Sequence, residues 1–154
     1  HISMQKQKKI CLISSHGGHL HELTEAVQNV RGNMYWVTFR TKHTEALLKN
    51  KRHYFVIDPV TSKPKFLLNA FQSLYHILRE RPEVIISTGA GMTIPTMLLG
   101  KFLLGSKIIY VESAAAVIEP SRTGQFMYKY ADLFLIQWDS LKTFYPKAKY
   151  VGVL

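Results

Sequence analysis

Short apolar runs alternate along the chain with longer segments in which apolar residues recur every three or four positions. The short runs predict strands and the longer segments predict helices. Strands are expected at residues 9–14, 34–39, 54–57, 83–87, 107–111, 133–137 and 150–153. Helices are expected at 20–30, 41–50, 64–81, 93–104 and 124–130, with a helical turn at 141–145. This alternation predicts an α/β fold, a single Rossmann-like domain whose mostly parallel sheet carries helices on both faces.

Two of the expected strands contain a continuous apolar run, at residues 84–86 and 108–111, as strands covered on both faces should. We interpret residues 1–3 as a cloning scar and residues 4–154 as the single domain. The first apolar run is too short for the core of a signal peptide. Cys11 is the single cysteine, so an internal disulfide is impossible, which suits a reducing cytoplasm.

The formal net charge of +10 points to an anionic partner. Nucleic acid is not expected, because the chain has neither paired zinc ligands nor an aromatic RNA-binding motif. The segment 64–81 has a broad apolar face between basic ends, which fits either a core-facing helix or a helix lying on a membrane surface. The apolar segment near 93–104 would span roughly 20 Å, short of a ~30 Å hydrocarbon core, so it should not cross a bilayer.

The first candidate site follows the first strand. Gly17 and Gly18 allow close backbone approach, and the helix N-terminus behind them favours an anion such as a diphosphate. His19 is the candidate general base, because imidazole titrates near neutral pH. Glu22 is expected either to orient His19 or to cap the helix.

A second glycine loop follows the strand at 83–87. Like the first loop, it lies between a strand and a helix. Its candidate phosphate contacts are Thr88, Gly89 and Gly91. Two such loops in one parallel sheet favour a shared cleft at the carboxyl ends of the strands.

Further candidate contacts follow the strand at 107–111. Glu112 and Ser113 are well placed to bind sugar hydroxyls, although a helix cap or a solvated acid would also explain Glu112. Arg122 is a candidate phosphate contact. The spacing of His16, His19 and His21 matches no standard zinc pattern, so no metal is expected. The first loop lacks the full G-x-G-x-x-G fingerprint, which argues against NAD.

The motifs at residues 17–22, 87–91, 110–113, 131–138 and 145–152 together resemble the Alg14/PssD/CpsF-type oligosaccharide-biosynthesis subunits over residues 8–154. The resemblance implies the N-terminal, acceptor-side half of a GT-B glycosyltransferase of the MurG type. It also implies a small partner protein that supplies the C-terminal half and binds most of the UDP-sugar donor, with no other cofactor.

Under that resemblance the chain would be the acceptor-side, membrane-associating subunit of an inverting two-component glycosyltransferase. The expected reaction moves a hexose, galactose by analogy with bacterial relatives, from a UDP-sugar to a polyprenyl-diphosphate-linked sugar in capsule or exopolysaccharide synthesis. His19 would remove the acceptor proton, the glycine loops would face phosphates, and Glu112 and Ser113 would contact sugars. No transmembrane helix of the eukaryotic type is visible, so attachment is expected to be peripheral, at the cytoplasmic face of a bacterial plasma membrane.

Two alternatives remain open on the sequence. The chain would serve equally as a non-catalytic anchoring or enhancer module that recruits and stabilises the catalytic partner. It would also be compatible with a self-sufficient nucleotide-binding enzyme.

Overall fold

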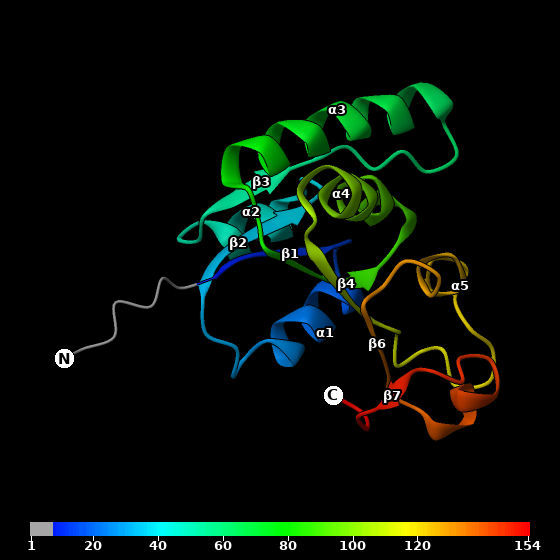
Figure 1. Cartoon of the computed structure of the whole chain (residues 1–154). Coiled ribbons are helices and arrows are strands. Elements are labelled where there is room, and N and C mark those ends of the chain that lie inside the picture. Colours follow the sequence, from blue (N-terminus) through cyan, green and yellow to red (C-terminus); the bar gives the residue numbers. More distant parts are fainter. Residues whose placement is uncertain (1–7) are drawn as a thin grey trace.

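The computed structural model describes residues 8–154 and shows a parallel sheet with helices packed on both faces (Figure 1). The expected cloning scar at residues 1–3 lies outside the described residues. The strands are β1 (Lys9–Ser14), β2 (Asn33–Thr38), β3 (His53–Phe55), β4 (Val84–Gly89), β5 (Lys107–Val111), β6 (Leu133–Ile136) and β7 (Lys149–Tyr150). They lie in the order β3-β2-β1-β4-β5-β6-β7, and each neighbouring pair is parallel. The predicted α/β fold with a parallel sheet is therefore confirmed.

The α-helices are α1 (Gly18–Ala26), α2 (Lys42–Leu48), α3 (Lys63–Glu80), α4 (Ile94–Leu99) and α5 (Arg122–Met127). The single helix predicted at 93–104 is instead three pieces, a 3-10 turn η1 (Gly91–Thr93), α4, and a π-helical turn η2 (Gly100–Leu104). The predicted helical turn at 141–145 is the 3-10 turn η3 (Asp139–Thr143). The first helix ends at Ala26 rather than at residue 30.

Two helices begin where their capping residues predict. Thr41 accepts a hydrogen bond from the Thr44 amide at 3.0 Å, while the Thr44 hydroxyl accepts one from the Thr41 amide at 2.8 Å. This reciprocal pair satisfies two amides that the first turn of α2 would otherwise leave unpaired. Ser62 caps α3 through a single hydrogen bond, which its hydroxyl accepts from the Lys65 amide.

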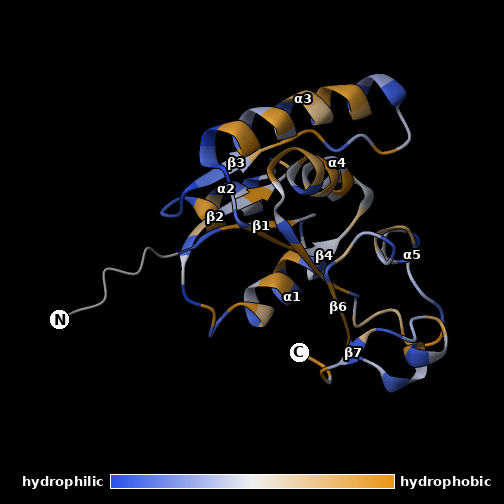
Figure 2. Ribbon diagram, in the orientation of Figure 1, coloured by the Kyte–Doolittle hydropathy of each residue, from blue (hydrophilic) through white to orange (hydrophobic). Residues whose placement is uncertain are grey.

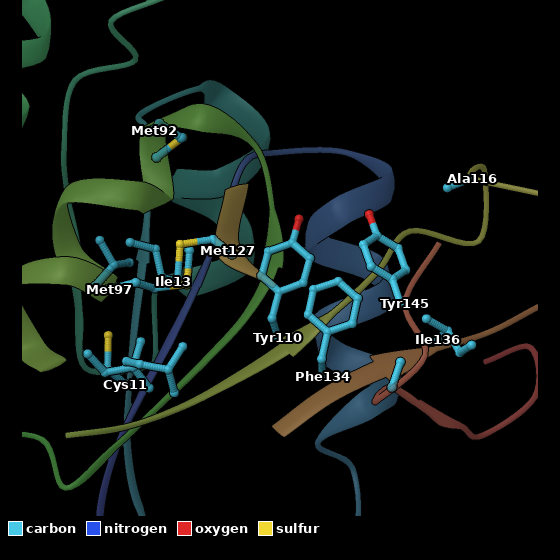
Figure 3. Close-up of a cluster of buried hydrophobic side chains, with 14 of the residues drawn as sticks. Cys11, Ile13, Met92, Met97, Tyr110, Ala116, Met127, Phe134, Ile136 and Tyr145 are labelled. Atoms are coloured by element: carbon cyan, nitrogen blue, oxygen red, sulfur yellow. The ribbon is translucent and has the colours of Figure 1, made fainter. Parts of the chain in front are cut away.

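The core forms two layers because side chains of a strand alternate between the faces of the sheet. The layer beneath α1 and α2 contains Ile10, Leu12, Leu20, Leu23, Val27, Trp36, Leu48 and Ile86. The layer beneath α4 and α5 contains Cys11, Ile13, Met97, Met127 and a group of aromatic rings (Figure 3). In that group Phe134 stacks on Tyr110 with ring centroids 5.2 Å apart and packs against Tyr145 at 4.5 Å.

The long helix α3 buries polar side chains and exposes apolar ones. The residues buried against the sheet and α4 include Asn69, Ser73, His76 and Glu80. The exposed large apolar side chains of the helix are Phe66, Leu67, Leu68, Phe71, Tyr75 and Leu78. Of the two interpretations left open for this segment, the core-facing one is therefore wrong for most of the apolar face, of which only Ile77 is fully buried.

Hydrogen bonds from three elements explain why α3 accepts this orientation. The Asn69 amide donates to the carbonyls of Ile57 at 2.8 Å and Met92 at 3.0 Å. The His76 ring lies between the hydroxyls of Tyr35 and Thr96, each 3.1 Å away. Burial lowers the pKa of His76 to about 3, so this ring is neutral at physiological pH.

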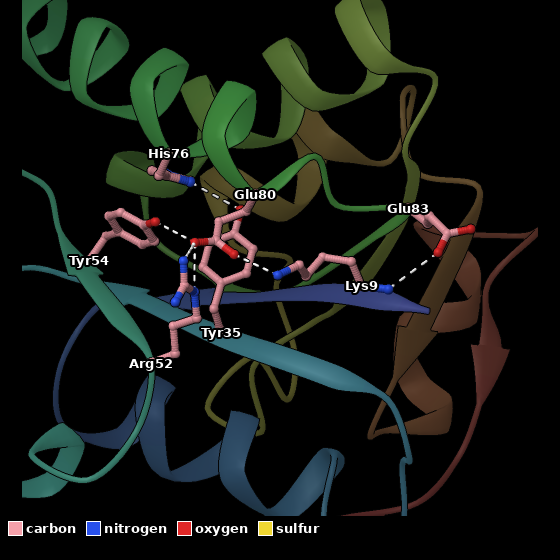
Figure 4. Close-up of polar contacts among 7 residues, drawn as sticks. All are labelled: Lys9, Tyr35, Arg52, Tyr54, His76, Glu80 and Glu83. Carbon is pink, nitrogen blue, oxygen red and sulfur yellow. Dashed lines mark hydrogen bonds and ion pairs between the residues drawn. The ribbon is translucent and has the colours of Figure 1, made fainter. Parts of the chain in front are cut away.

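The last turn of α3 carries a buried carboxylate, Glu80, at the amino-terminal side of the sheet (Figure 4). Its oxygens accept from the Lys9 ammonium at 2.7 Å, the Arg52 guanidinium at 2.6 Å and the Tyr54 hydroxyl. Burial alone would raise the pKa of Glu80, but the hydrogen bonds from Arg52, Lys9 and Tyr54 outweigh it and hold the pKa at about 2. A carboxylate whose pKa is lower in the folded than in the unfolded state stabilises the fold fully when the pH is above the unfolded-state pKa. This stabilisation is lost as the pH falls through the folded-state pKa.

We predict that Glu80→Gln lowers the free energy of unfolding at pH 7 by about 3 kcal/mol, the value of a pKa shift from 4.5 to about 2. The difference from the wild type should shrink as the pH falls from about 4.5 to about 2, where Glu80 itself becomes protonated. Urea unfolding across this pH range measures the effect.

Glu45→Gln is the matched control, because Glu45 pairs with Arg40 on the exposed surface. It should change the unfolding free energy by less than about 1 kcal/mol. A Glu80→Gln protein whose deficit stays constant down to pH 2 would contradict the assignment.

Candidate functional site

The order of the strands reverses between β1 and β4, because the chain adds strands first on one side of β1 and then on the other. Open parallel sheets bind ligands at this point, beyond the carboxyl ends of the strands. The two glycine loops predicted as phosphate contacts follow β1 and β4. They therefore lie on the same edge of the sheet and next to each other, as a shared cleft requires.

His19 and Thr88 join the two loops by reciprocal hydrogen bonds. The His19 Nδ1 atom lies 3.0 Å from the Thr88 carbonyl oxygen, and the Thr88 hydroxyl donates to the His19 carbonyl. A carbonyl can only accept, so Nδ1 donates in this hydrogen bond and Nε2 is the ring nitrogen that faces away from it. No described residue hydrogen-bonds Nε2, which is the arrangement a general base requires.

The acceptor for His19 comes from an irregularity in the sheet. Ile13 pairs with Ser87 but Ser14 pairs with Gly89, so Thr88 is an extra residue in β4. Such a bulge removes a residue from the regular ladder and redirects its polar groups. The Thr88 carbonyl is thereby available to the imidazole.

The glycines differ in how strongly the structure requires them. Gly17 and Gly89 have positive φ angles of 68° and 111°. A Cβ atom at Gly89 would also lie 2.5 Å from the Tyr110 hydroxyl oxygen. Gly18 and Gly91 have ordinary φ angles, and a Cβ atom at either would meet nothing within 4 Å, so their backbone accepts other residues. Their proposed phosphate contacts remain predictions.

Glu22 neither orients His19 nor caps α1, contrary to both expectations. Its carboxylate accepts from the Ala114 amide at 2.7 Å, the Gln137 side-chain amide at 2.8 Å and the Ser113 hydroxyl at 3.3 Å. These partners lie after β5 and β6. Glu22 therefore ties the start of α1 to the neighbouring loops on the same edge.

Glu112 is not available to bind sugar hydroxyls, because it is completely buried. Its carboxylate accepts from the Ser121 hydroxyl at 2.6 Å, the Tyr145 hydroxyl at 2.7 Å, and the amides of Ser121 and Ser113. A Cβ atom at Gly124 would clash with the same carboxylate. Glu112 thus anchors the chain between β5 and α5.

The other two predicted contacts are more exposed. Ser113 is half-buried, donates to Glu22 and accepts from the Ala115 amide at 3.1 Å. Arg122 is exposed at the first position of α5, next to the serine that holds Glu112. Both residues remain candidate contacts, and neither lies in the His19–Thr88 pair.

Sequence reasoning missed the role of Gln137. This buried side chain donates to Glu22 and to the Glu112 carbonyl at 2.9 Å, and its oxygen accepts from the Leu154 amide. Its neighbour Trp138 donates to the Ala114 carbonyl at 2.6 Å. The available signal was a polar residue directly after an apolar strand.

Within residues 8–154, no group of three His, Cys, Asp or Glu side chains is arranged to hold a metal ion.

Residues 56–154 match the family described as "Oligosaccharide biosynthesis protein Alg14 like". The chain belongs to this Alg14-like family. It is 29% identical to the UDP-N-acetylglucosamine transferase subunit ALG14 of Debaryomyces hansenii, over 94% of this chain and 75% of that protein. It is 25% identical to the subunit of the same name from Mus musculus, over 99% of this chain and 85% of that protein.

The fold of the Alg14-like chain is that of one half of a GT-B enzyme. It superimposes on the crystal structure of Acinetobacter baumannii MurG with a TM-score of 0.74 and 17% identity, covering 95% of this chain and 45% of that one. The predicted likeness to the N-terminal half of a MurG-type glycosyltransferase is confirmed at the level of the fold.

One part of the functional expectation is wrong. The relatives are named as subunits of UDP-N-acetylglucosamine transferases and come from fungi and mammals. They therefore do not support a bacterial capsular or exopolysaccharide galactosyltransferase, nor a bacterial plasma membrane. The expected sugar came from an analogy with bacterial proteins, whereas the matching relatives are named for N-acetylglucosamine.

We predict that Gly89→Ala lowers the free energy of unfolding by about 2 kcal/mol, because alanine is strained at a φ of 111° and its Cβ meets Tyr110. Gly91→Ala is the matched control, with an expected change below about 0.5 kcal/mol. Urea unfolding of both variants measures the contrast. Equal effects at the two positions would show that the loop after β4 relaxes freely.

Proposed function

We propose that this Alg14-like chain is the non-catalytic anchoring subunit of a UDP-N-acetylglucosamine transferase. It would hold a catalytic partner subunit at a membrane surface, beside a polyprenyl-diphosphate-linked sugar acceptor. The observation that carries the proposal is the outward apolar face of α3, in a chain whose relatives are named transferase subunits.

The outer face of α3 has the composition of a helix that lies on a membrane. Leu67, Phe71 and Tyr75 are 58%, 62% and 57% exposed. Figure 2 shows hydrophobic bands along this helix, which lies at the outside of the molecule. Such a surface would bury its rings at the boundary between headgroups and acyl chains.

Basic residues at both ends of α3 complement this face. Lys63 and Lys65 lie in its first turn, and Arg79 and Arg81 lie at its end. Each would be attracted to anionic headgroups by about 1 kcal/mol. Within residues 8–154, no helix is long and apolar enough to cross a bilayer.

The names of the relatives support the need for a partner, because they are called transferase subunits. The fold matches 45% of the MurG chain. A GT-B active site forms between two halves, so a second protein would supply the remaining wall and the main contacts to the UDP-sugar donor. The carboxyl edge of the sheet, with the two glycine loops, is the surface that would face it.

We predict that Phe71→Ser weakens binding of the purified chain to vesicles of mixed neutral and anionic phospholipid by about tenfold or more. The loss in affinity corresponds to the burial of one aromatic ring in the membrane, which the variant no longer makes. Vesicle co-sedimentation measures the affinity. Phe144→Ser is the control, because Phe144 is also exposed but lies outside α3. Equal weakening by both changes, or by neither, would contradict the membrane role of α3.

A second candidate function is that the chain also supplies the catalytic base. The observation that favours it is the free Nε2 of His19 among the described residues, in a ring fixed by the Thr88 carbonyl. On this hypothesis Nε2 removes the proton of the attacking acceptor hydroxyl.

We predict that His19→Ala separates the two functions when the chain is co-purified with its catalytic partner. Transfer from UDP-N-acetylglucosamine to a lipid-linked acceptor should fall by about 10²–10⁴-fold if His19 is the base. Anchoring alone predicts a turnover within about twofold of the wild type. Ser140→Ala is a control away from the glycine loops, because its hydroxyl donates only to the Val117 carbonyl.

A further inference from the structure

A hollow of about 390 Å³ opens at the carboxyl ends of β2 and β3. Apolar side chains form most of its wall, namely Phe39, Phe55, Val56 and Ile57. Its polar wall consists of Arg40, Asp58 and Gln72, the last of which comes from α3. The volume lies in the range of natural small-molecule sites.

The polar groups around the hollow include one cation, Arg40, that can change partner. Gln72 accepts from the Ile57 amide at 2.6 Å and is therefore already paired. Asp58 accepts from the Val60 amide at 3.1 Å, which turns one of its oxygens toward its own loop, and it keeps its negative charge. Arg40 lies over the Phe55 ring at 4.6 Å and pairs with Glu45 at 2.9 Å. Both side chains of that ion pair are exposed, so it contributes little to stability. Arg40 can therefore exchange Glu45 for a more highly charged anion.

The hollow lies between the glycine loop after β1 and the outer face of α3. On one side, the Phe39 ring contacts the ring of His16, with centroids 4.6 Å apart. On the other side, the chain runs from Asp58 into a second, separate hollow, whose lining includes Pro59, Val60, Lys63 and Phe66. Val60 is 78% exposed and Phe66 is 45% exposed, so exposed apolar side chains lie along the chain between Asp58 and the first turn of α3.

We propose that this hollow holds the first isoprene units and the diphosphate of the lipid-linked acceptor, with Arg40 as the diphosphate contact. The proposal rests on the proposed function, because it assumes that the chain works beside such a lipid. Branched isoprene units match the apolar wall, and a guanidinium binds phosphate oxygens in a bidentate manner. Their path would run from the α3 face past Val60 to Phe39, and would deliver the attached sugar to the loop that carries His19.

A photoreactive benzophenone analogue of farnesyl diphosphate tests the proposal on the purified chain. Labelled peptides, identified by mass spectrometry, should contain residues 39–40 or 55–58. Unlabelled farnesyl diphosphate should compete, whereas inorganic diphosphate and farnesol should compete at least tenfold less well. Equal competition by inorganic diphosphate would show that the hollow binds anions without recognising the isoprene chain, and would overturn the proposal.

Arg40→Glu should reduce labelling at least tenfold, the loss expected when a charge-assisted contact becomes repulsive. Arg31→Glu changes the charge equally at an exposed position before β2 and should leave labelling unchanged. Urea unfolding of both variants shows whether each still folds, and Arg40→Lys should restore part of the labelling. Labelling confined to the outer face of α3 would overturn this proposal and leave the anchoring function intact.

Activity of the assembled enzyme gives an independent readout. Ile57→Trp fills the hollow and should raise the KM for a polyprenyl-diphosphate-linked N-acetylglucosamine at least tenfold, with the KM for UDP-N-acetylglucosamine unchanged. An unchanged acceptor KM would overturn the proposal. A wild-type complex that transfers nothing to this acceptor would instead overturn the proposed function, while the photolabelling would still report on the hollow.

Discussion

The orientation of α3 depends on the row of polar side chains that it buries. Asn69, His76 and Glu80 each find partners on different elements, and these partners are available at only one rotation of the helix. Turning the helix so that its apolar residues faced the sheet would carry Glu80 into water. It would also leave the buried hydroxyls of Tyr35 and Thr96 without their present partner on α3, at a cost of several kcal/mol. The outward apolar face and the wall that Gln72 supplies to the hollow both follow from this constraint.

The carboxyl edge of the sheet is organised by a second set of polar contacts. Glu22 and Gln137 connect loops that follow β1, β5 and β6, and Glu112 holds the chain that leads to α5. Buried and fully paired networks of this kind fix one geometry, because any shift leaves a polar group unsatisfied. The acidic residues of the edge therefore shape the surface on which His19 and the glycine loops lie.

Much of the fold could be predicted because local rules determine it. β5 has the bounds that its apolar run indicated, and α3 begins one residue before the predicted position 64. The facing of α3 could not be predicted, because it depends on Met92 and Tyr35, which are distant in sequence. A sequence pattern shows that a helix has an apolar face but not what that face meets.

The same limit applies to the candidate site. The adjacency of the two glycine loops followed from the order of a parallel sheet. The burial of Glu112 did not, since it depends on Ser121 and on Tyr145, which lies 33 residues further along the chain. An acidic residue after a strand has the same appearance in a sequence whether it faces a ligand or the interior. Only the contacts made by the folded chain separate the two cases.

The bulge at Thr88 has a consequence for how this edge tolerates mutation. The imidazole of His19 is held by a main-chain carbonyl, which every amino acid possesses. Genetic drift at position 88 can remove the hydroxyl but not this acceptor, provided that the bulge itself survives. Selection to keep the imidazole oriented would therefore act on the backbone shape of the bulge rather than on the identity of the residue within it.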